Sequence, residues 1–526
     1  MPEYKYQNFY EIIQNNAMVA PKKTALFLDD KKISNLSLKQ DIDTFARFLE
    51  FSGIKKEDRV AMVVGNSIEF IVSLFAITKI GAIAVPINTF LKREELEYII
   101  NDCGAKLLIS SPLYAKETKN LIDTTPIEKI VWTEKYDALD DQNYSFAEME
   151  ATIGEDDETK EARPSLDDLA CIVYTSGTTG KPKGAMLSFK NILSNSVGAN
   201  EVFNVRTSDR FIVFLPMFHS FTLSTSVLLP LFAGASIVVV KSIFPFANVL
   251  KQALLRRVTV FLGVPTLYTA LLKAKIPWYF MYFHKVRLFI SGGAPLSEVA
   301  LNAFGKKFKK STLIEGYGLS ECSPVVAANT LQLRKPLSVG APIPGYSVKI
   351  VNDEMVELPL GDIGEIIVKG DNVMQGYLNR PDATDETIIN GWLRTGDLGK
   401  MDEDGYIFIV DRKKDLIIAK GINIYPREIE ELILKYDGVD STAVVGLKGN
   451  DGDEDVIAFI QPKEDTILAE MDIKKYLKVH LANFKVPKVI YMVEELPKNA
   501  TGKVLKRVLK EQILKGDFAK ENKGRH

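Results

Sequence analysis

The chain has 526 residues, of which 46% are hydrophobic, and its formal net charge at pH 7 is -2. This length predicts more than one domain, and a charge near zero argues against a general nucleic-acid-binding protein. The three cysteines are far apart and the four histidines lack metal-ligand spacing, which argues against disulfides and a structural zinc site and favours the reducing cytoplasm.

Two apolar regions raise the question of a membrane span. Region 68–87 is interrupted by Glu69 and Lys79, and region 220–240 contains Pro230 and Gly234. Neither gives about 20 uninterrupted apolar residues, and the N-terminus lacks the apolar core of a signal peptide. We therefore expect a soluble protein in which both regions form buried helices and strands.

Helix and strand patterns alternate over the first part of the chain. Ser37 and Gln40 predict a capping box at the start of a helix, and Gly53 is placed to close that helix. Continuous Val, Ile and Leu runs in such an alternation favour an α/β fold with parallel sheets covered by helices. The expected strands and helices that follow are 59–64, 67–80, 82–87, 93–102 and 105–110.

An acidic connection over residues 152–168 leads to a loop between two expected strands, 170–174 and 185–187. Glycines allow backbone N–H groups to approach an anion, and hydroxyls and lysines add donors and positive charge, so the loop suits a polyphosphate. Its spacing differs from G-x-x-x-x-G-K-[ST], and a flexible surface loop is the alternative. The candidate binding residues are Thr175, Ser176, Gly177, Thr178, Thr179, Gly180, Lys181 and Lys183.

The alternation resumes with expected strands at 211–215, 236–240, 258–262, 286–290 and 312–315. Ligands of open α/β sheets bind at the carboxyl ends of strands. Turn or polar residues follow four of these strand ends. Connecting loops alone would not need such residues at so many ends. These segments are Pro216–His219, Gly263–Thr266, Ser291–Pro295 and Gly316–Glu321.

Short strands and turns between Gly340 and Asp411 predict a small β-rich subdomain, and the charged run Asp411–Asp415 follows it. We expect a large N-terminal domain of stacked βα sheets, residues 1–411, and a small mobile α+β domain, residues 412–526, with a hinge near 411–416. Residues 485–526 hold 11 Lys/Arg and 5 Asp/Glu, a net of +6. A solvated helix face is the simpler explanation, and peripheral contact with the inner membrane face is the alternative.

The string Tyr174–Gly184 resembles the phosphate loop of the adenylate-forming enzymes, the superfamily of acyl-CoA synthetases, luciferases and adenylation domains. Gly316–Glu321 is similar to the family motif Y-G-x-[ST]-E. The resemblance implies that Tyr317 stacks on adenine, that Ser320 contacts the α-phosphate, and that Glu321 holds Mg²⁺ with Thr175 as a second contact. It also implies nucleotide contacts at Gly292, Gly293, Glu315, Gly316 and Gly318.

Further motifs extend the resemblance over roughly residues 10–510. Thr395–Asp397 is similar to [ST]-G-D, which implies that Asp397 accepts the ribose hydroxyls together with Arg412. Lys414 matches the hinge position. The segment Lys420–Glu430 is similar to the pantetheine-tunnel signature, which implies Lys420 and Gly421 as coenzyme A contacts.

Two more motifs bear on the reacting atoms. Pro497–Lys503 resembles the motif of the invariant adenylation lysine, which implies that Lys503 bridges the carboxylate and the α-phosphate. Leu215–Phe221 resembles the gate before the acyl pocket and implies His219 near the substrate carboxylate. His219 and Ser320 join Lys503 as candidate catalytic residues, but His219 has no expected proton-transfer role because the acid is already ionised.

The resemblance implies an AMP-forming acid–thiol ligase that uses ATP, Mg²⁺ and coenzyme A, most similar to bacterial medium- or long-chain fatty acid–CoA ligases. The expected partners are a fatty acid or related carboxylic acid and coenzyme A, with no nucleic acid, and the expected state is a monomer or homodimer. The alternatives are a fatty acyl-AMP ligase that loads an acyl carrier protein, an aryl-acid CoA ligase, and an inactive nucleotide-binding scaffold. The motif residues argue against the scaffold, because Glu321, Asp397, Arg412 and Lys503 are all present.

Overall fold

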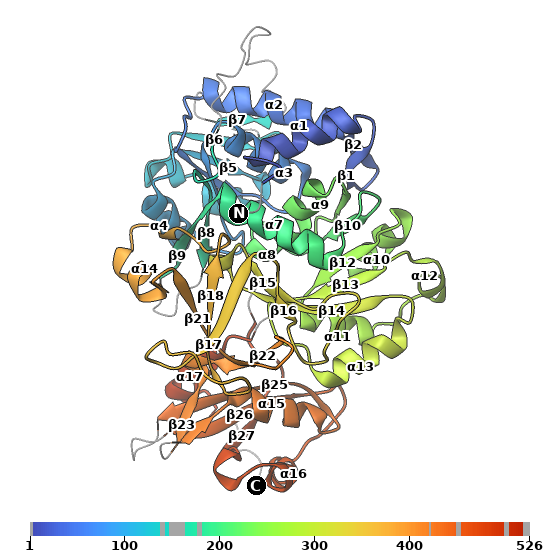
Figure 1. Cartoon of the computed structure of the whole chain (residues 1–526), viewed down its shortest axis with the longest axis vertical. Helices are drawn as coiled ribbons and strands as arrows, with labels where there is room; N and C mark the ends of the chain where they lie inside the picture. Colours follow the sequence, from blue (N-terminus) through green and yellow to red (C-terminus); the bar gives the residue numbers. More distant parts are fainter. Residues whose placement is uncertain are drawn as a thin grey trace.

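The computed structural model describes residues 4–136, 143–146, 164–175, 181–419, 422–448, 454–498 and 504–518. Three sheets form the upper part of the molecule and two small sheets form its lower end (Figure 1). The expected α/β architecture, with a large sheet-based N-terminal part and a small C-terminal part, is confirmed.

The first sheet has eight strands in the order β19-β9-β8-β4-β3-β5-β6-β7. It is parallel from β8 to β7, and β9 and β19 are added antiparallel at one edge. The expected strands on either side of the phosphate loop are therefore β8 and β9, paired directly with each other. The strands are β3 Arg59–Val63, β4 Ile83–Pro86, β5 Leu107–Ser110, β6 Lys129–Trp132, β7 Asn143–Ser145, β8 Leu169–Thr175, β9 Lys183–Ser188 and β19 Gly376–Tyr377.

The second sheet has nine strands in the order β16-β15-β14-β13-β12-β10-β11-β1-β2, parallel except at its two edges. Its central strands are fully buried runs of Val, Ile, Leu and Phe, as a sheet covered on both faces requires. The strands are β1 Thr24–Leu28, β2 Lys31–Ser34, β10 Arg210–Val213, β11 Ser236–Val239, β12 Val260–Gly263, β13 Leu288–Ser291, β14 Thr312–Gly318, β15 Val325–Ala328 and β16 Ala341–Pro342.

Helices pack against these two sheets and fill the space between them with aromatic side chains such as Phe9, Phe75 and Phe189. The helices are α1 Phe9–Val19, α2 Asn35–Phe51, α3 Ile68–Lys79, α4 Arg93–Cys103, α5 Ala115–Thr118, α7 Phe189–Phe203, α8 Ser220–Thr222, α9 Leu229–Phe232, α10 Phe246–Leu255, α11 Pro265–Lys273, α12 Trp278–Phe283 and α13 Glu298–Lys307. A π-helical turn, Leu223–Leu228, joins α8 directly to α9.

The start of α2 corrects one sequence-based expectation. Ser34, not Ser37, is the N-cap: its side chain accepts the N–H of Ser37 at 3.0 Å. The helix begins three residues early because β2 ends at Ser34 with an extended backbone, which is the conformation that an N-cap needs.

The third sheet is five-stranded and antiparallel, which confirms the expected β-rich subdomain. It lies between the two large sheets and the C-terminal end in Figure 1. Its strands are β17 Tyr346–Val351, β18 Gly364–Gly370, β20 Ile388–Ile389, β21 Trp392–Met401 and β22 Ile407–Arg412, with helix α14 Pro381–Thr387 beside them.

The C-terminal part begins at the end of β22 and contains a two-stranded and a three-stranded sheet covered by helices. Helix α15 starts with Pro426 in its first turn, as its sequence predicts. The elements are β23 Ile417–Ala419, β24 Ile422–Ile424, α15 Pro426–Lys435, β25 Val439–Lys448, β26 Glu454–Pro462, α16 Glu470–His480, β27 Val489–Met492 and α17 Lys506–Lys515.

The two apolar regions lie inside the fold. Region 68–87 forms α3 and β4, and region 220–240 forms the α8–α9 segment and β11. Across the described ranges we find no helix with the length and apolar character needed to span a bilayer.

Candidate active site

Two side chains from two sheets meet at the buried carboxylate of Asp397. Tyr317, on β14, donates its hydroxyl hydrogen to Oδ2 of Asp397 at 2.7 Å, and Nε of Arg412 lies 3.1 Å from Oδ1. Asp397 and Arg412 are directly paired across β21 and β22, which fixes this geometry in the backbone. Burial, followed by the nearby Asp397, raises the pKa of Tyr317 well above its usual value, so the phenol keeps its proton.

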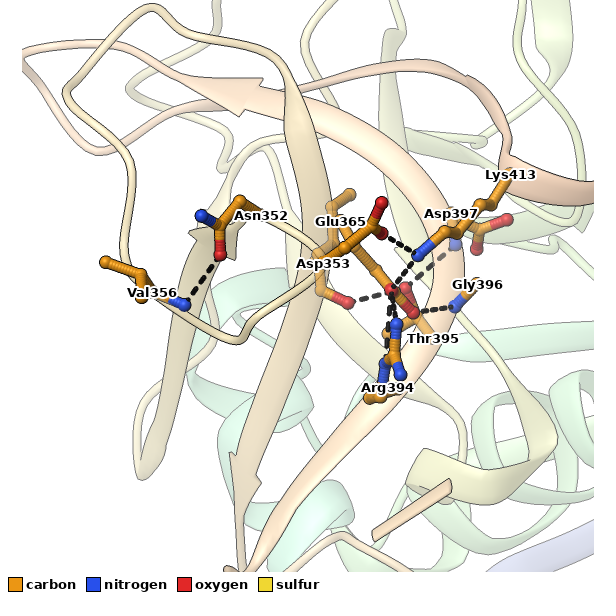
Figure 2. Close-up of polar contacts among 10 residues, drawn as sticks. Asn352, Asp353, Val356, Glu365, Arg394, Thr395, Gly396, Asp397 and Lys413 are labelled. Atoms are coloured by element: carbon orange, nitrogen blue, oxygen red, sulfur yellow. Dashed lines mark hydrogen bonds and ion pairs between the residues drawn. The ribbon is translucent and has the colours of Figure 1, made fainter. Parts of the chain in front are cut away.

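A second buried carboxylate, Glu365, holds the turn that carries Asp397 (Figure 2). Its Oε1 accepts the N–H of Gly396 at 3.2 Å, and its Oε2 accepts from Arg394 at 2.6 Å and from Lys413 at 3.0 Å. Burial alone would raise the pKa of Glu365, but the hydrogen bonds from Arg394 and Lys413 outweigh it and hold the pKa below its usual value. Glu365 therefore joins the Asp397 turn to the residue before Lys414.

Two of the residues expected to bind phosphate lie on β8 and β9. Thr175 pairs with Lys183 across the two strands, and Lys183 Nζ lies 4.4 Å from the ring centroid of Tyr377. Tyr377 in turn donates its hydroxyl hydrogen to Oε1 of Glu321 at 2.9 Å. A continuous line of contacts thus connects Thr175 to Glu321, the two residues expected to hold the metal.

The donor set suits a magnesium ion that is held mainly by phosphate oxygens. Mg²⁺ takes one or two protein oxygens and completes its octahedron with substrate phosphates and water. The Glu321 carboxylate and the Thr175 hydroxyl supply oxygen ligands of that kind. Among the described residues there is no cluster of three or more His, Cys, Asp or Glu, so nothing there forms an all-protein metal cage.

The gate segment meets the nucleotide-site motif through two hydroxyls. Oγ of Ser320 lies 2.7 Å from Oγ of Ser220, the first residue of α8. His219 is the N-cap of α8, and its Nδ1 accepts the N–H of Phe221 at 3.3 Å. Burial lowers the pKa of His219, so its imidazole is neutral at pH 7.

Two of the glycines expected to contact the nucleotide leave little room for a side chain. A side-chain carbon at Gly292 would lie 3.0 Å from the Phe221 ring, and one at Gly318 would overlap the carbonyl oxygen of Pro324. Gly293 has a φ of +81°, which favours glycine. A side chain at Gly292 or Gly318 would therefore collide with a neighbouring ring or backbone atom, whereas one at Gly316 would be at ordinary contact distance.

Glu315 is 7% exposed at the end of β14, where it accepts the N–H of Leu296 at 3.4 Å. Burial raises its pKa from an ordinary 4.5 to about 7. The folded protein therefore binds the Glu315 proton more tightly than the unfolded chain does. The free energy of unfolding should consequently fall as the pH rises from about 4.5 to about 7.

We expect Glu315→Gln to remove this pH dependence. Relative to wild type, the variant should gain about 3 kcal/mol of unfolding free energy between those two pH values, because one pKa unit corresponds to about 1.4 kcal/mol. Urea unfolding of the nucleotide-free protein at several pH values measures the difference. Glu354→Gln, on an exposed turn, is the control and should follow wild type; a Glu315→Gln curve parallel to both would contradict the expectation.

The predicted hinge region lies at the contact between the two parts of the chain. Lys414 belongs to a short turn, Lys413–Asp415, and burial, followed by the nearby Arg412, lowers its pKa. Across this turn, Oδ2 of Asp411 accepts the N–H of Arg427 at 2.9 Å, and Arg427 donates to the carbonyl oxygen of Ile409 at 2.5 Å. The N-terminus of α15 is thus capped by the strand that precedes the hinge.

Several predicted residues lie outside the described residues: Ser176, Gly177, Thr178, Thr179, Gly180, Lys420, Gly421 and Lys503. Two described residues lie next to these stretches. Nζ of Lys181 is 5.2 Å from the ring centroid of Tyr98, and Lys498 forms an antiparallel bridge with Val504. The residues that sequence reasoning missed are Glu365 and Tyr377. A lone acid in the apolar run of β18 is a usable sequence signal for Glu365. The sequence holds no such signal for Tyr377, because its position depends on the pairing of β19 with β9.

Comparison with known proteins gives matches over almost the whole chain. The family model for AMP-binding enzymes matches residues 13–378, and that for the AMP-binding enzyme C-terminal domain matches residues 428–503. The chain is 32% identical to a long-chain-fatty-acid–CoA ligase of Escherichia coli O6:H1, with 97% of this chain and 95% of that protein covered. It is 33% identical to a 2-succinylbenzoate–CoA ligase of Bacillus cereus, with 95% and 98% covered. The crystal structure of ATP-bound MatB from Rhodopseudomonas palustris matches with a TM-score of 0.88 and 33% identity, covering 96% and 98% of the two chains.

Proposed function

Since the chain belongs to the AMP-binding enzyme family and is an AMP-forming acid–CoA ligase, we propose that its acid is a medium- or long-chain fatty acid. One observation carries this proposal: the hydroxyl pair Ser220–Ser320 connects the nucleotide-site motif directly to an uncharged buried segment, Ser220–Phe232. A carboxylate bound beside Ser320 would therefore have its chain directed toward apolar residues. The similarity to long-chain-fatty-acid–CoA ligases supports the same assignment.

In the proposed first step, the fatty carboxylate attacks the α-phosphate of ATP and pyrophosphate leaves. Asp397 and Arg412 bind the ribose; each carboxylate oxygen of Asp397 already has one partner and keeps a second lone pair for a ribose hydroxyl. The Tyr317 ring packs on adenine, between the glycine-bearing ends of β13 and β14, with Glu315 at its margin.

The phosphates of ATP lie, in this proposal, against the β8–β9 loop. Thr175, Lys183 and Ser320 provide hydroxyl and ammonium donors, together with the loop residues 176–181. Bound Mg²⁺, held by Glu321 and Thr175, would neutralise phosphate charge. Lys503 stabilises the charge that develops between the carboxylate oxygen and the α-phosphate, and His219, held neutral, lines the approach of the acid.

The second half-reaction uses a different arrangement of the two parts of the chain. We place the domain boundary between residues 411 and 412 and the hinge at Lys414. Rotation there withdraws Lys503 and brings Lys420 and Gly421 to the site, where the thiol of coenzyme A attacks the acyl carbonyl and AMP leaves. The Asp411–Arg427 contact joins residues on opposite sides of the hinge, and we expect it to break in this rotation.

An aryl acid is the second candidate substrate. The chain is as similar to a 2-succinylbenzoate–CoA ligase as to the fatty acid ligase, and the Phe221 ring lies against Gly292 at the entrance of the apolar segment. A ring-shaped pocket would be short and closed by such a side chain, whereas a fatty acid needs room beyond it.

Pyrophosphate release and AMP formation should separate these candidates. We expect turnover that depends on coenzyme A and peaks at medium or long chains when acids from acetate to oleate, coumarate and 2-succinylbenzoate are compared. Replacing coenzyme A by phosphopantetheinylated acyl carrier protein tests whether the acyl group is transferred to a carrier protein instead. A peak at coumarate or 2-succinylbenzoate would overturn the fatty acid assignment, and pyrophosphate release without a CoA thioester would move the acceptor to the carrier protein.

A further inference from the structure

Helix α12 presents large aromatic side chains to solvent. Its sequence, Trp278–Phe283, is apolar on every side, yet only one face is buried. Phe280 is 3% exposed and stacks on His284 with ring centroids 5.4 Å apart. The other face leaves Trp278, Tyr279, Tyr282 and Phe283 exposed by 76%, 46%, 67% and 56%. A helix that is apolar all round is normally buried, so this outer face is suited to a contact that the isolated chain does not make.

The sequence around α12 carries charge of one sign, although acids from other segments pair with Arg256, Lys273 and Arg287. From Arg210 to Ser297 the sequence holds nine Lys or Arg and no Asp or Glu. Lys275 and Lys285, which bracket α12, are exposed, and neither has an ion-pair partner among the residues that the structure describes. Lys310 lies at the same face, because its Nζ donates to the carbonyl oxygen of Tyr282 at 3.1 Å and lies 5.0 Å from the Tyr282 ring centroid.

Tryptophan, tyrosine and lysine together are the side chains that favour a membrane–water interface. The aromatic rings enter the headgroup region, and lysine ammonium groups pair with anionic lipids at its surface. Protein–protein interfaces are instead depleted in lysine. We propose that the outer face of α12, with Lys275, Lys285 and Lys310, docks on the surface of a bilayer that contains anionic lipids.

The position of α12 is compatible with docking, because Figure 1 shows it at the outer edge of the N-terminal part. Phe280, on its inner face, belongs to an apolar cluster against which Phe221 also packs. Phe221 lies beside Gly292 and two residues after His219 in the chain. If the acid is a long-chain fatty acid, as the proposed function holds, docking would place the apolar cluster next to the phase in which that acid dissolves.

Vesicle flotation tests the docking itself. Wild-type protein should float with vesicles of phosphatidylcholine and phosphatidylserine at low ionic strength, and less with phosphatidylcholine alone or at high salt. Trp278→Ser/Phe283→Ser should weaken binding about tenfold through lost apolar burial. Lys275→Glu/Lys285→Glu should weaken it at least about tenfold, because each lysine near an anionic surface is worth roughly fivefold in affinity.

Matched controls change equally exposed side chains elsewhere. Ile467→Ser removes a 96% exposed apolar side chain, and Leu514→Ser/Lys515→Glu changes the end of α17 in the basic C-terminal region. Both should float like wild type. The proposal is overturned if wild type stays unbound to every vesicle, if the α12 variants float like wild type, or if the α17 variant alone loses binding, which would place the contact at the C-terminal end.

An activity measurement distinguishes failure of this inference from failure of the proposed function. The α12 variants should keep wild-type turnover of octanoate in solution and lose it, about tenfold, for oleate presented in anionic vesicles. Equal turnover of vesicle-borne oleate by wild type and variants would overturn the delivery role. Absence of wild-type turnover with both fatty acids would instead overturn the fatty acid assignment, and the flotation result would still decide the docking.

Discussion

Replacing Lys503 by alanine is expected to slow acyl-adenylate formation at least about a hundredfold, by analogy with the loss of one donor that acts in the transition state. A lysine is a mobile point charge that reaches both the carboxylate oxygen and the α-phosphate as negative charge builds between them. Fatty-acid-dependent exchange of pyrophosphate into ATP measures this half-reaction directly.

The same variant should leave the attack of coenzyme A on supplied acyl-adenylate nearly unchanged, because the proposed rotation withdraws Lys503 before the second step. Lys498→Ala is the matched control, since Lys498 is exposed and lies five positions before Lys503. We expect it to behave as wild type in both half-reactions. Equal losses in the two half-reactions for Lys503→Ala would disprove the division of roles across the hinge.

Glu365→Ala should destabilise the protein by about 1–3 kcal/mol, because it removes the buried acceptor of hydrogen bonds from Arg394, Lys413 and Gly396, while the Arg394 and Lys413 side chains stay partly exposed to water. Glu365 is 4% exposed, and its loss would leave Arg394 and the Gly396 N–H without their acceptor, while Lys413 would keep only Asp353. The loosened Gly396–Asp397 turn should also raise the KM for ATP about tenfold, as expected when a positioning contact is lost.

Chemical unfolding and initial-rate kinetics on the same preparation test this pair of effects. Glu357→Ala is the matched control, because Glu357 bonds Lys349 of the same sheet at 2.7 Å but is 58% exposed at its side chain. A surface pair of this kind is worth about 0–1 kcal/mol. If Glu365→Ala resembled Glu357→Ala in stability and in KM, Glu365 would have no role in holding the ribose turn.

Much of the fold could be predicted from local pattern, because buried parallel strands are continuous apolar runs. The strands around Arg59, Ile83 and Leu107 differ from their expected limits by at most two residues. The start of α2 was placed wrongly at Ser37 because two serines three positions apart are both good N-caps, and only the end of β2 decides between them.

The candidate site could be predicted where a motif is contiguous in sequence, as in Gly316–Glu321. Local pattern could not show which motifs meet. The bond from Tyr317 to Asp397 spans 80 positions, and that from Tyr377 to Glu321 spans 56. Glu365 was missed for the same reason: its partners Arg394, Gly396 and Lys413 come together only when β18, β21 and β22 pair.

The proposed nucleotide site draws its residues from three different sheets: Thr175 and Lys183 from the first, Tyr317 from the second, and Asp397 with Arg412 from the third. During synthesis on the ribosome, the second sheet and strands β3 to β9 of the first sheet are complete before β21 and β22, which carry Asp397 and Arg412, have emerged. The nascent chain then has phosphate-binding strands without a ribose carboxylate. Contacts between distant segments form late in folding. ATP therefore cannot assist the early steps of assembly, and recovery of ATP binding should report the last of them.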